Sequence, residues 1–182
     1  EILNKKNIKN NKRVIVDVEI LKSTDGSEGV GANCTDRGRK GIKESIIIDY
    51  DSKAIIETYV DKANVHDSKI LHKMNFTNEQ HNKNKVIYAD SAYIGKPLRD
   101  HCRNHNIRIV SVPKKLRNKK LSHYLQTTDR QKLKQRWSIE RIISIYRQFR
   151  GICVKRTKTI DAFKSMFNLV SMCITSLSLF VH

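Results

Sequence analysis

The sequence predicts an α/β fold in which helices flank a mixed sheet, with the element order β-β-β-α-β-α-β-α-α. Three strand-length runs rich in β-branched residues precede the first helical segment, which predicts neighbouring antiparallel strands. The later strand runs alternate with helical segments, which is typical of parallel strands joined by helical crossovers. With 182 residues and with its apolar residues gathered into runs, the chain has room for one domain with a core.

The predicted strands are short apolar runs bounded by polar or glycine-containing segments. The first, residues 13–21 (RVIVDVEIL), places three valines and an isoleucine on one face and Asp17 on the other. The remaining strands are expected at 42–50, 53–62, 85–89 and 107–112. Residues 22–41 hold five of the seven glycines and are expected to form a long loop.

Helices are expected where apolar residues recur at helical spacing, at about 68–74, 97–105, 128–149 and 163–181. His66 and Asp67 are expected to set the start of the first helix, and Trp137 is expected in the core. Residues 1–12 are polar and are expected to form a flexible basic segment before a domain spanning 13–182. This order matches the RNase H-like architecture, in which three antiparallel strands precede strands that connect through helices.

The chain is strongly basic, with a net charge of +18 and a pI near 9.9. Residues 91–160 contain 19 Lys and Arg against 3 Asp and Glu, so this segment carries +16 of the total. Such a surface is typical of a protein that binds nucleic acid. A membrane span is not expected, because Lys164 and Asn168 interrupt the most apolar stretch, and four widely spaced cysteines indicate reduced intracellular thiols.

Three carboxylates, Asp17, Asp90 and Glu140, contrast with this basic background. Asp17 lies within the first strand, and Asp90 follows the fourth, where α/β folds place functional side chains. Glu140 shares a narrow helix face with Arg136 and Arg147, which lie about 40° and about 20° away around the axis. Carboxylates from distant parts of a chain are the ligands that a pair of Mg²⁺ ions needs, and a cationic surface suits a phosphate backbone. The pattern predicts a metal-dependent enzyme that cuts or joins DNA.

Each carboxylate also has an ordinary structural interpretation. Glu140 fits a surface ion pair with the arginine one turn earlier, which contributes a few tenths of a kcal/mol. Asp90 fits a turn or cap aspartate. Asp17 fits the polar side of a half-exposed strand, and Asp25 and Asp36 in the glycine-rich loop compete with it as the first carboxylate of the set.

The segment Arg136-Trp-Ser-Ile-Glu140-Arg141 resembles the C-terminal signature of bacterial insertion-sequence DDE transposases, Tyr-x2-Arg-x3-Glu-x6-Lys. Arg136 and Glu140 match this signature, Arg147 replaces its lysine, and Leu133 replaces its tyrosine.

Two further segments carry the same resemblance. VIYADSAYIG, residues 86–95, looks like the family's second-Asp motif, a strand followed by Asp-x-x-Tyr and a glycine. Asp17 precedes a stretch ending in Lys22-Ser23 that resembles the family's first-Asp motif. The resemblance covers roughly residues 13–180.

The resemblance implies an RNase H-like catalytic domain with two Mg²⁺ ions, or Mn²⁺ as an alternative, held by Asp17, Asp90 and Glu140. It implies cleavage of a DNA strand and transfer of that strand into a target, with double-stranded element ends and target DNA as partners. It further implies a homodimer or larger assembly on DNA, a place at the nucleoid in the bacterial cytoplasm, and an upstream DNA-recognition region that this sequence lacks. The residues expected to bind DNA phosphates are Arg136, Arg141, Arg147, Lys114, Lys115, Arg117, Lys119 and Lys120.

Two other functions fit the same residues. A decayed copy that only binds DNA fits the Leu133 departure from the signature, and Mg²⁺-dependent cleavage of an end-containing duplex separates it from an active enzyme. An RNase H-like nuclease would cut without strand transfer, and joining of a 3′-OH end to a second duplex would exclude it.

Overall fold

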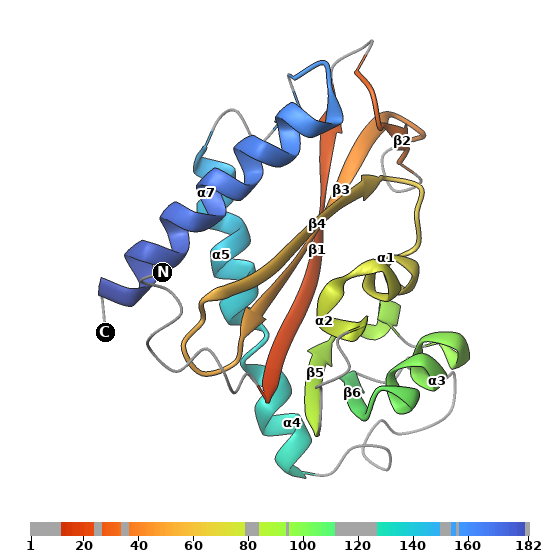
Figure 1. The fold of residues 1–182 in the computed structure, drawn as a ribbon, viewed down its shortest axis with the longest axis vertical. Coiled ribbons are helices and arrows are strands. Elements are labelled where there is room, and N and C mark those ends of the chain that lie inside the picture. The colour runs from red at the N-terminus through yellow and green to blue at the C-terminus, as the bar shows by residue number, and fades with distance from the viewer. Residues whose placement is uncertain are drawn as a thin grey trace.

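The computed structural model describes residues 12–23, 27–33, 37–78, 84–93, 95–111, 127–149, 154–155 and 157–180. Within these ranges the chain forms one mixed sheet with helices on both faces, as the sequence predicts (Figure 1). The expected flexible segment 1–12 lies outside the described residues except for its last residue, and so does the basic stretch 114–120.

The sheet is built around β1 (Arg13–Ser23), which pairs antiparallel with β3 (Lys40–Asp49) and parallel with β5 (Lys85–Ala89). On one side β4 (Ile55–Lys62) pairs antiparallel with β3, and on the other β6 (Ile107–Ser111) pairs parallel with β5. This order and these directions are those of the RNase H-like arrangement that the sequence predicts. Two short strands were not predicted: β2 (Gly31–Ala32) pairs with β3, and β7 (Val154–Lys155) pairs with β1.

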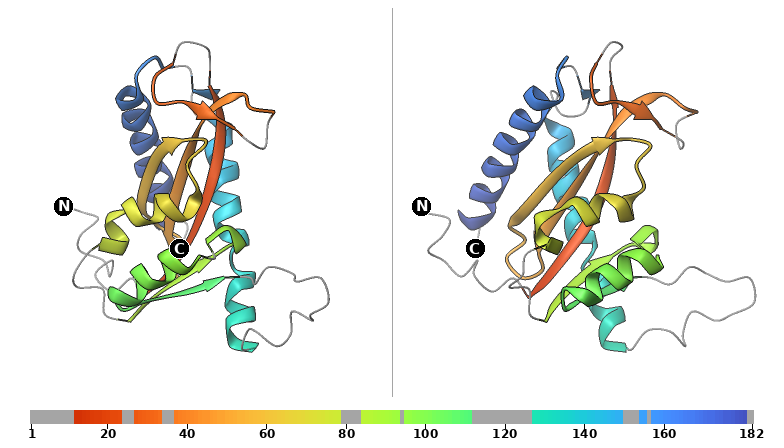
Figure 2. Two further views of the ribbon diagram at one scale, coloured as in Figure 1. Left: turned by 90° about the vertical axis from the view of Figure 1, so that its right-hand side faces the viewer. Right: turned by 45° about the vertical axis from the view of Figure 1, so that its right-hand side comes forward.

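The sheet is covered on both faces. Helices α5 (Trp137–Gln148) and α7 (Ile160–Phe180) pack on one face, where the core includes Ile15, Tyr88 and Phe167. Helices α1 (Asp67–Lys73), α2 (Asn75–Asn78) and α3 (Lys96–Asn104) cover the other face, as the turned views show (Figure 2). Since β1 is covered on both sides, the side that carries Asp17 is not a half-exposed polar face.

The predicted single helix at 128–149 is wrong. It divides into α4 (Thr127–Lys134) and α5, with a turn at residues 135–136. The backbone tightens there, because the amides of Gln135 and Arg136 bond to carbonyls three residues earlier. The Ser138 hydroxyl also donates to the Gln135 carbonyl at 2.6 Å, which occupies an oxygen that a continuous helix would use. The break places Arg136 at the very start of α5.

Helix α4 is attached to the sheet by one apolar and one charged contact. Leu133, which stands where the transposase signature has tyrosine, is 8% exposed and lies in the core with α5 and α7. Asp129 is buried and pairs with Arg108 of β6. Leu133 therefore has a packing role.

Helix α7 contributes a stripe of apolar side chains to the core. Phe163 and Phe167 are fully buried, and the ring of Phe167 lies 4.8 Å from that of Tyr146 on α5. The Tyr146 hydroxyl is hydrogen-bonded to Ser171, one turn beyond Phe167. Among the described helices, none is long and apolar enough to cross a membrane.

The position of Phe167 predicts a large loss of stability in Phe167→Ala. Removing a fully buried aromatic ring should lower the free energy of unfolding by about 3–5 kcal/mol. Leu169→Ala, on the exposed side of the same helix, should change it by no more than about 0.5 kcal/mol. Urea unfolding followed by circular dichroism measures both, and equal losses in the two variants would contradict the packing of α7.

Candidate active site

The sheet brings two of the three predicted carboxylates together. In the parallel pairing of β1 with β5, Ile15 lies opposite Tyr88, so the same register extended by two residues sets Asp17 opposite Asp90. Neighbouring strands are about 4.8 Å apart. Consistent with this, the negative charge of Asp90 raises the pKa of Asp17.

Asp17 lies in a partly buried position on the α5 side of the sheet. One carboxylate oxygen accepts a hydrogen bond from the Val18 amide at 2.9 Å, and the other lies 3.4 Å from Nη2 of Arg136. Burial is the main cause that raises the pKa of Asp17, and the charge of Asp90 adds to it, while the Val18 amide and Arg136 oppose the rise. Asp17 and Asp90 thus form a pair of neighbouring carboxylates, of which Asp17 is partly buried.

Arg136 connects this pair to Glu140. The same Nη2 that approaches Asp17 lies 3.8 Å from Oε1 of Glu140, one helical turn further on. The two carboxylates differ in exposure, because the Glu140 side chain is 64% exposed and that of Asp17 is 17% exposed. The helix-surface ion pair that competed as an interpretation of Glu140 is present, but its arginine lies closer to Asp17.

Asp90 ends β5 and begins a short 3-10 turn, Ser91–Tyr93. Its Oδ1 accepts a hydrogen bond from the Ala92 amide at 2.8 Å, so the turn-capping role that competed for Asp90 is also present. Behind it, the buried Tyr93 has its pKa raised well above the usual value, chiefly by burial and then by the charges of Asp67, Asp17 and Asp90. The negative charges that act on Tyr93 therefore come from Asp17 and Asp90 and also from Asp67 at the start of α1.

The donor chemistry of this site fits Mg²⁺. Asp17, Asp90 and Glu140 offer only carboxylate oxygens, which hard divalent cations prefer. Among the described residues no three metal-ligating side chains stand close enough together to hold an ion as they are. Arg136 lies between Asp17 and Glu140, so a cation bound to Asp17 would compete with its guanidinium.

The remaining predicted site residues are placed less uniformly. Arg141 is exposed on α5, whereas Arg147 is ion-paired with Glu19 of β1. The other predicted phosphate-binding residues lie outside the described residues: Lys114, Lys115, Arg117, Lys119 and Lys120. The competing carboxylates Asp25 and Asp36 lie outside them as well.

Two further expectations have clear outcomes. His66 is the N-cap of α1, where its Nδ1 accepts a hydrogen bond from the Ser68 amide at 3.3 Å, and Asp67 lies in the first turn, as predicted. The prediction that Trp137 is a core residue is wrong, because it is 58% exposed. Trp137 begins α5 two residues before the buried Ile139, which turns it about 200° around the helix, away from the sheet.

The structure shows a second acidic pair that sequence reasoning missed. Glu19 and Glu44 lie directly opposite each other on β1 and β3, on the same side of the sheet as Asp17. Glu19 binds Arg147, whereas Glu44 is 1% exposed and one of its oxygens, Oε1, is buried without a hydrogen-bond partner in the part of the chain that the structure describes. Burial and the charge of Glu19 raise the pKa of Glu44 well above its usual value. The available signal was the alternation along β1, which places Glu19 on the face of Asp17.

An RNase H-like sheet that carries a carboxylate pair at the meeting point of β1 and β5, next to a helix with arginine and glutamate one turn apart, defines a class of nucleic-acid phosphoryl-transfer domains. The comparison with known families agrees with this class. The sequence model described as "Transposase DDE domain" matches residues 9–176, so the chain belongs to the DDE transposase family.

Among solved structures, the chain is similar to a piggyBac transposase in a synaptic complex with hairpin DNA. The identity is 15% and the TM-score 0.40, over 64% of this chain. The matched part is 26% of that transposase, so this chain spans about a quarter of its length. No curated protein matches the sequence.

Glu44 provides a pH-dependent prediction. A buried carboxyl whose pKa is raised in the folded state contributes its full stability below the unfolded-state pKa of about 4.3 and loses it as the pH rises through the folded-state value. The side chain at position 44 in Glu44→Gln is neutral at every pH. The free energy of unfolding of this variant should therefore rise relative to that of the wild type between pH 4 and pH 8, by up to about 1.4 kcal/mol per pH unit. Urea unfolding at several pH values measures this, and a constant difference would show that Glu44 is ionised in the folded protein.

Proposed function

We propose that this chain is the catalytic domain of a DNA transposase that cuts a DNA strand and then transfers its 3′ end into target DNA with the help of Mg²⁺. The observation that carries the proposal is the meeting of Asp17 and Asp90 beside the Arg136–Glu140 turn of α5, within a chain of the DDE transposase family. An insertion sequence in a bacterium is the proposed source, and the cytoplasm is the proposed location.

Asp17 and Asp90 would hold one metal ion, and Glu140 would complete the site of a second. Mg²⁺ or Mn²⁺ bound there would activate the attacking oxygen and stabilise the leaving oxygen of an in-line displacement. One carboxylate oxygen of Asp90 accepts a hydrogen bond from the Ala92 amide, which fixes the orientation of the carboxylate. The arrangement of Glu140, exposed at the start of α5, leaves it accessible from the solvent side of the site.

Arg136 has a role in the DNA-free chain that follows from its contacts. Its guanidinium lies between Asp17 and Glu140 and supplies the positive charge that the two carboxylates need. When metal ions take over that charge, the same guanidinium becomes available for a DNA phosphate, which it can bind through two parallel hydrogen bonds. Arg136 therefore serves both states.

The proposed DNA-binding face surrounds this site. Arg141 and Trp137 are exposed on α5, where an arginine suits phosphates and an aromatic ring can stack on an unpaired base. The basic segment 114–120 is proposed to bind DNA phosphates from its charge alone. Double-stranded element ends and target DNA are the proposed partners, and a dimer or larger assembly is proposed because two ends must be held together.

A second function, DNA binding without catalysis, is favoured by one observation. Leu133 replaces the signature tyrosine and is packed in the core, so it offers no hydroxyl to the site. A nuclease of the same fold without strand transfer is the third alternative. Joining of a pre-cut 3′-OH end to a second duplex distinguishes an active transposase from both.

The substitutions Asp90→Asn and Glu140→Gln test the catalytic assignment. Each removes a proposed metal ligand, so strand cleavage should fall by more than about 100-fold, beyond the range for residues that only support a ligand. Cleavage is measured as Mg²⁺-dependent nicking of a duplex that carries the element's ends. Affinity for the same duplex, measured by fluorescence anisotropy with Ca²⁺ in place of Mg²⁺, should stay within about twofold.

Asp161→Asn is the matched control. It removes one carboxylate charge from an exposed position on α7, where Asp161 pairs only loosely with Lys164 at 3.4 Å. It should leave cleavage unchanged while it alters the net charge by the same amount as the test variants. If the E140Q protein still nicked the element's ends, the assignment of Glu140 as a metal ligand would be wrong.

A further inference from the structure

We propose that Glu19 is a positioning residue: through Arg147 it holds α5 in register with β1, and so sets the place of Glu140 relative to Asp17. This inference rests on the proposed function, because it concerns the geometry of the proposed metal site. It also changes the role of Arg147 in the DNA-free protein from a phosphate-binding residue to a structural partner of Glu19.

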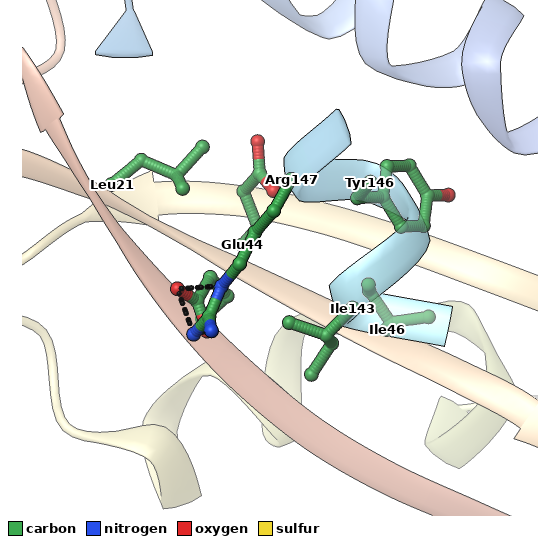
Figure 3. A pocket seen from close by; sticks show the side chains of 7 residues that line it. Leu21, Glu44, Ile46, Ile143, Tyr146 and Arg147 are labelled. Carbon is green, nitrogen blue, oxygen red and sulfur yellow. Dashed lines mark hydrogen bonds and ion pairs between the residues drawn. The ribbon is translucent and has the colours of Figure 1, made fainter. Parts of the chain in front are cut away.

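The contact between the two side chains is a bidentate ion pair. Nη2 of Arg147 lies 2.8 Å from Oε1 and 2.9 Å from Oε2 of Glu19, and Nε lies 3.2 Å from Oε1. Figure 3 shows the Arg147 side chain extending from α5 toward β1, the strand that carries Glu19. Two parallel hydrogen bonds fix the orientation of both groups as well as the distance between them.

The positions of Glu19 in β1 and of Arg147 in α5 explain how this contact can set the place of Glu140. Glu19 follows Asp17 by two residues, on the same side of β1. Arg147 follows Glu140 by seven residues, two helical turns, on nearly the same face of α5. The Arg136–Asp17 contact holds the start of α5, and the Arg147–Glu19 contact holds its end. A helix attached to a strand at two points can neither slide along it nor rotate about a single contact.

The surroundings favour a strong contact. A small pocket beside the pair is lined by Leu21, Ile46, Ile143 and Tyr146, together with Glu44 (Figure 3). The side chain of Glu19 is 20% exposed and that of Arg147 is 60% exposed, so the protein shields the carboxylate of this ion pair while water reaches the guanidinium. Glu44, which lies opposite Glu19, is the more deeply buried of the two, and Glu19 is the one whose oxygens bind Arg147.

Lysine at position 147 separates the two roles of this residue. Lysine keeps the positive charge that a DNA phosphate needs, but it lacks the planar fork that binds both oxygens of Glu19. Arg147→Lys should therefore damage a positioning contact and spare a phosphate contact. Glu19→Gln removes the charge of the partner and should have the same effect as Arg147→Lys.

The experiment compares E19Q, R147K and the double variant with the wild type. Calorimetric titration of the DNA-free proteins with Mn²⁺ should show binding weakened about tenfold in each single variant and no further in the double variant. The Mg²⁺ concentration for half-maximal cleavage should rise by a similar factor, while affinity for end DNA stays within about twofold. Hydrogen exchange of the α5 amides, residues 137–148, should accelerate in the same three variants.

Two control variants are matched to this design. E44Q changes the glutamate opposite Glu19 and leaves the Glu19–Arg147 ion pair in place, so it should bind Mn²⁺ at neutral pH like the wild type. Asp51→Asn breaks another bidentate pair with an arginine, that of Arg13, four residues before Asp17 on β1. It should leave both Mn²⁺ binding and exchange in α5 unchanged.

The outcomes separate the alternatives. The proposal would be overturned if R147K and E19Q bound Mn²⁺ as tightly as the wild type, showed wild-type hydrogen exchange in α5, and E19Q bound end DNA more tightly. Arg147 would then be assigned to DNA binding. If the wild type itself binds no Mn²⁺, the proposed metal function fails. In that case hydrogen exchange of the α5 amides is the remaining test of whether Glu19 positions the helix. Unchanged exchange in E19Q would overturn the positioning role as well.

Discussion

The sharing of one guanidinium between two carboxylates governs this site. Arg136 lies at the break between α4 and α5, and its Nη2 approaches Asp17 on the sheet and Glu140 on the helix. The burial of Asp17 and the nearby charge of Asp90 would make an uncompensated pair unfavourable at neutral pH. Arg136 lowers that cost, and the turn at residues 135–136 is what brings it to the sheet. The division of the predicted single helix is thus a requirement of the site.

The acidic side chains on one side of β1 are compensated by arginines of α5 and of the turn before it. The side of β1 toward α5 carries two acids, and each has an arginine from the start or the end of α5: Asp17 with Arg136, and Glu19 with Arg147. Glu44 faces the same space from β3, and burial and Glu19 raise its pKa well above the usual value. The helix is therefore attached by its charged ends and by the isoleucines between them, which pack on the sheet. This attachment fixes the side of the sheet on which Glu140 lies.

Patterns of local period predicted most of the fold. The alternation in residues 13–21 and the apolar runs at 85–89 and 107–111 became β1, β5 and β6, because each run is buried in the sheet. The break at residues 135–136 was not predicted because helical spacing continues across it, and it is seen in the bond of the Ser138 hydroxyl and in backbone hydrogen bonds that span three residues instead of four. The prediction for Trp137 was wrong for a different reason, because helical spacing itself turns this residue about 200° away from the buried Ile139. Glu19 and Glu44 are paired by strand register, which a single sequence does not specify.

The relative positions of Asp17 and Glu140 show what a helical pattern leaves open. Spacing placed Glu140 on the same face as Arg136 and Arg147, and this is correct, but a shared face does not fix the distance to the sheet. In the structure Asp17 has the deeper position and Glu140 the exposed one, with Arg136 between them. An acid on a strand is held by the strand register, whereas an acid on a helix is held only as firmly as the helix itself. The position of Glu140 relative to Asp17 therefore depends on the contacts that fix α5, and the ion pair of Arg147 with Glu19 is one of them.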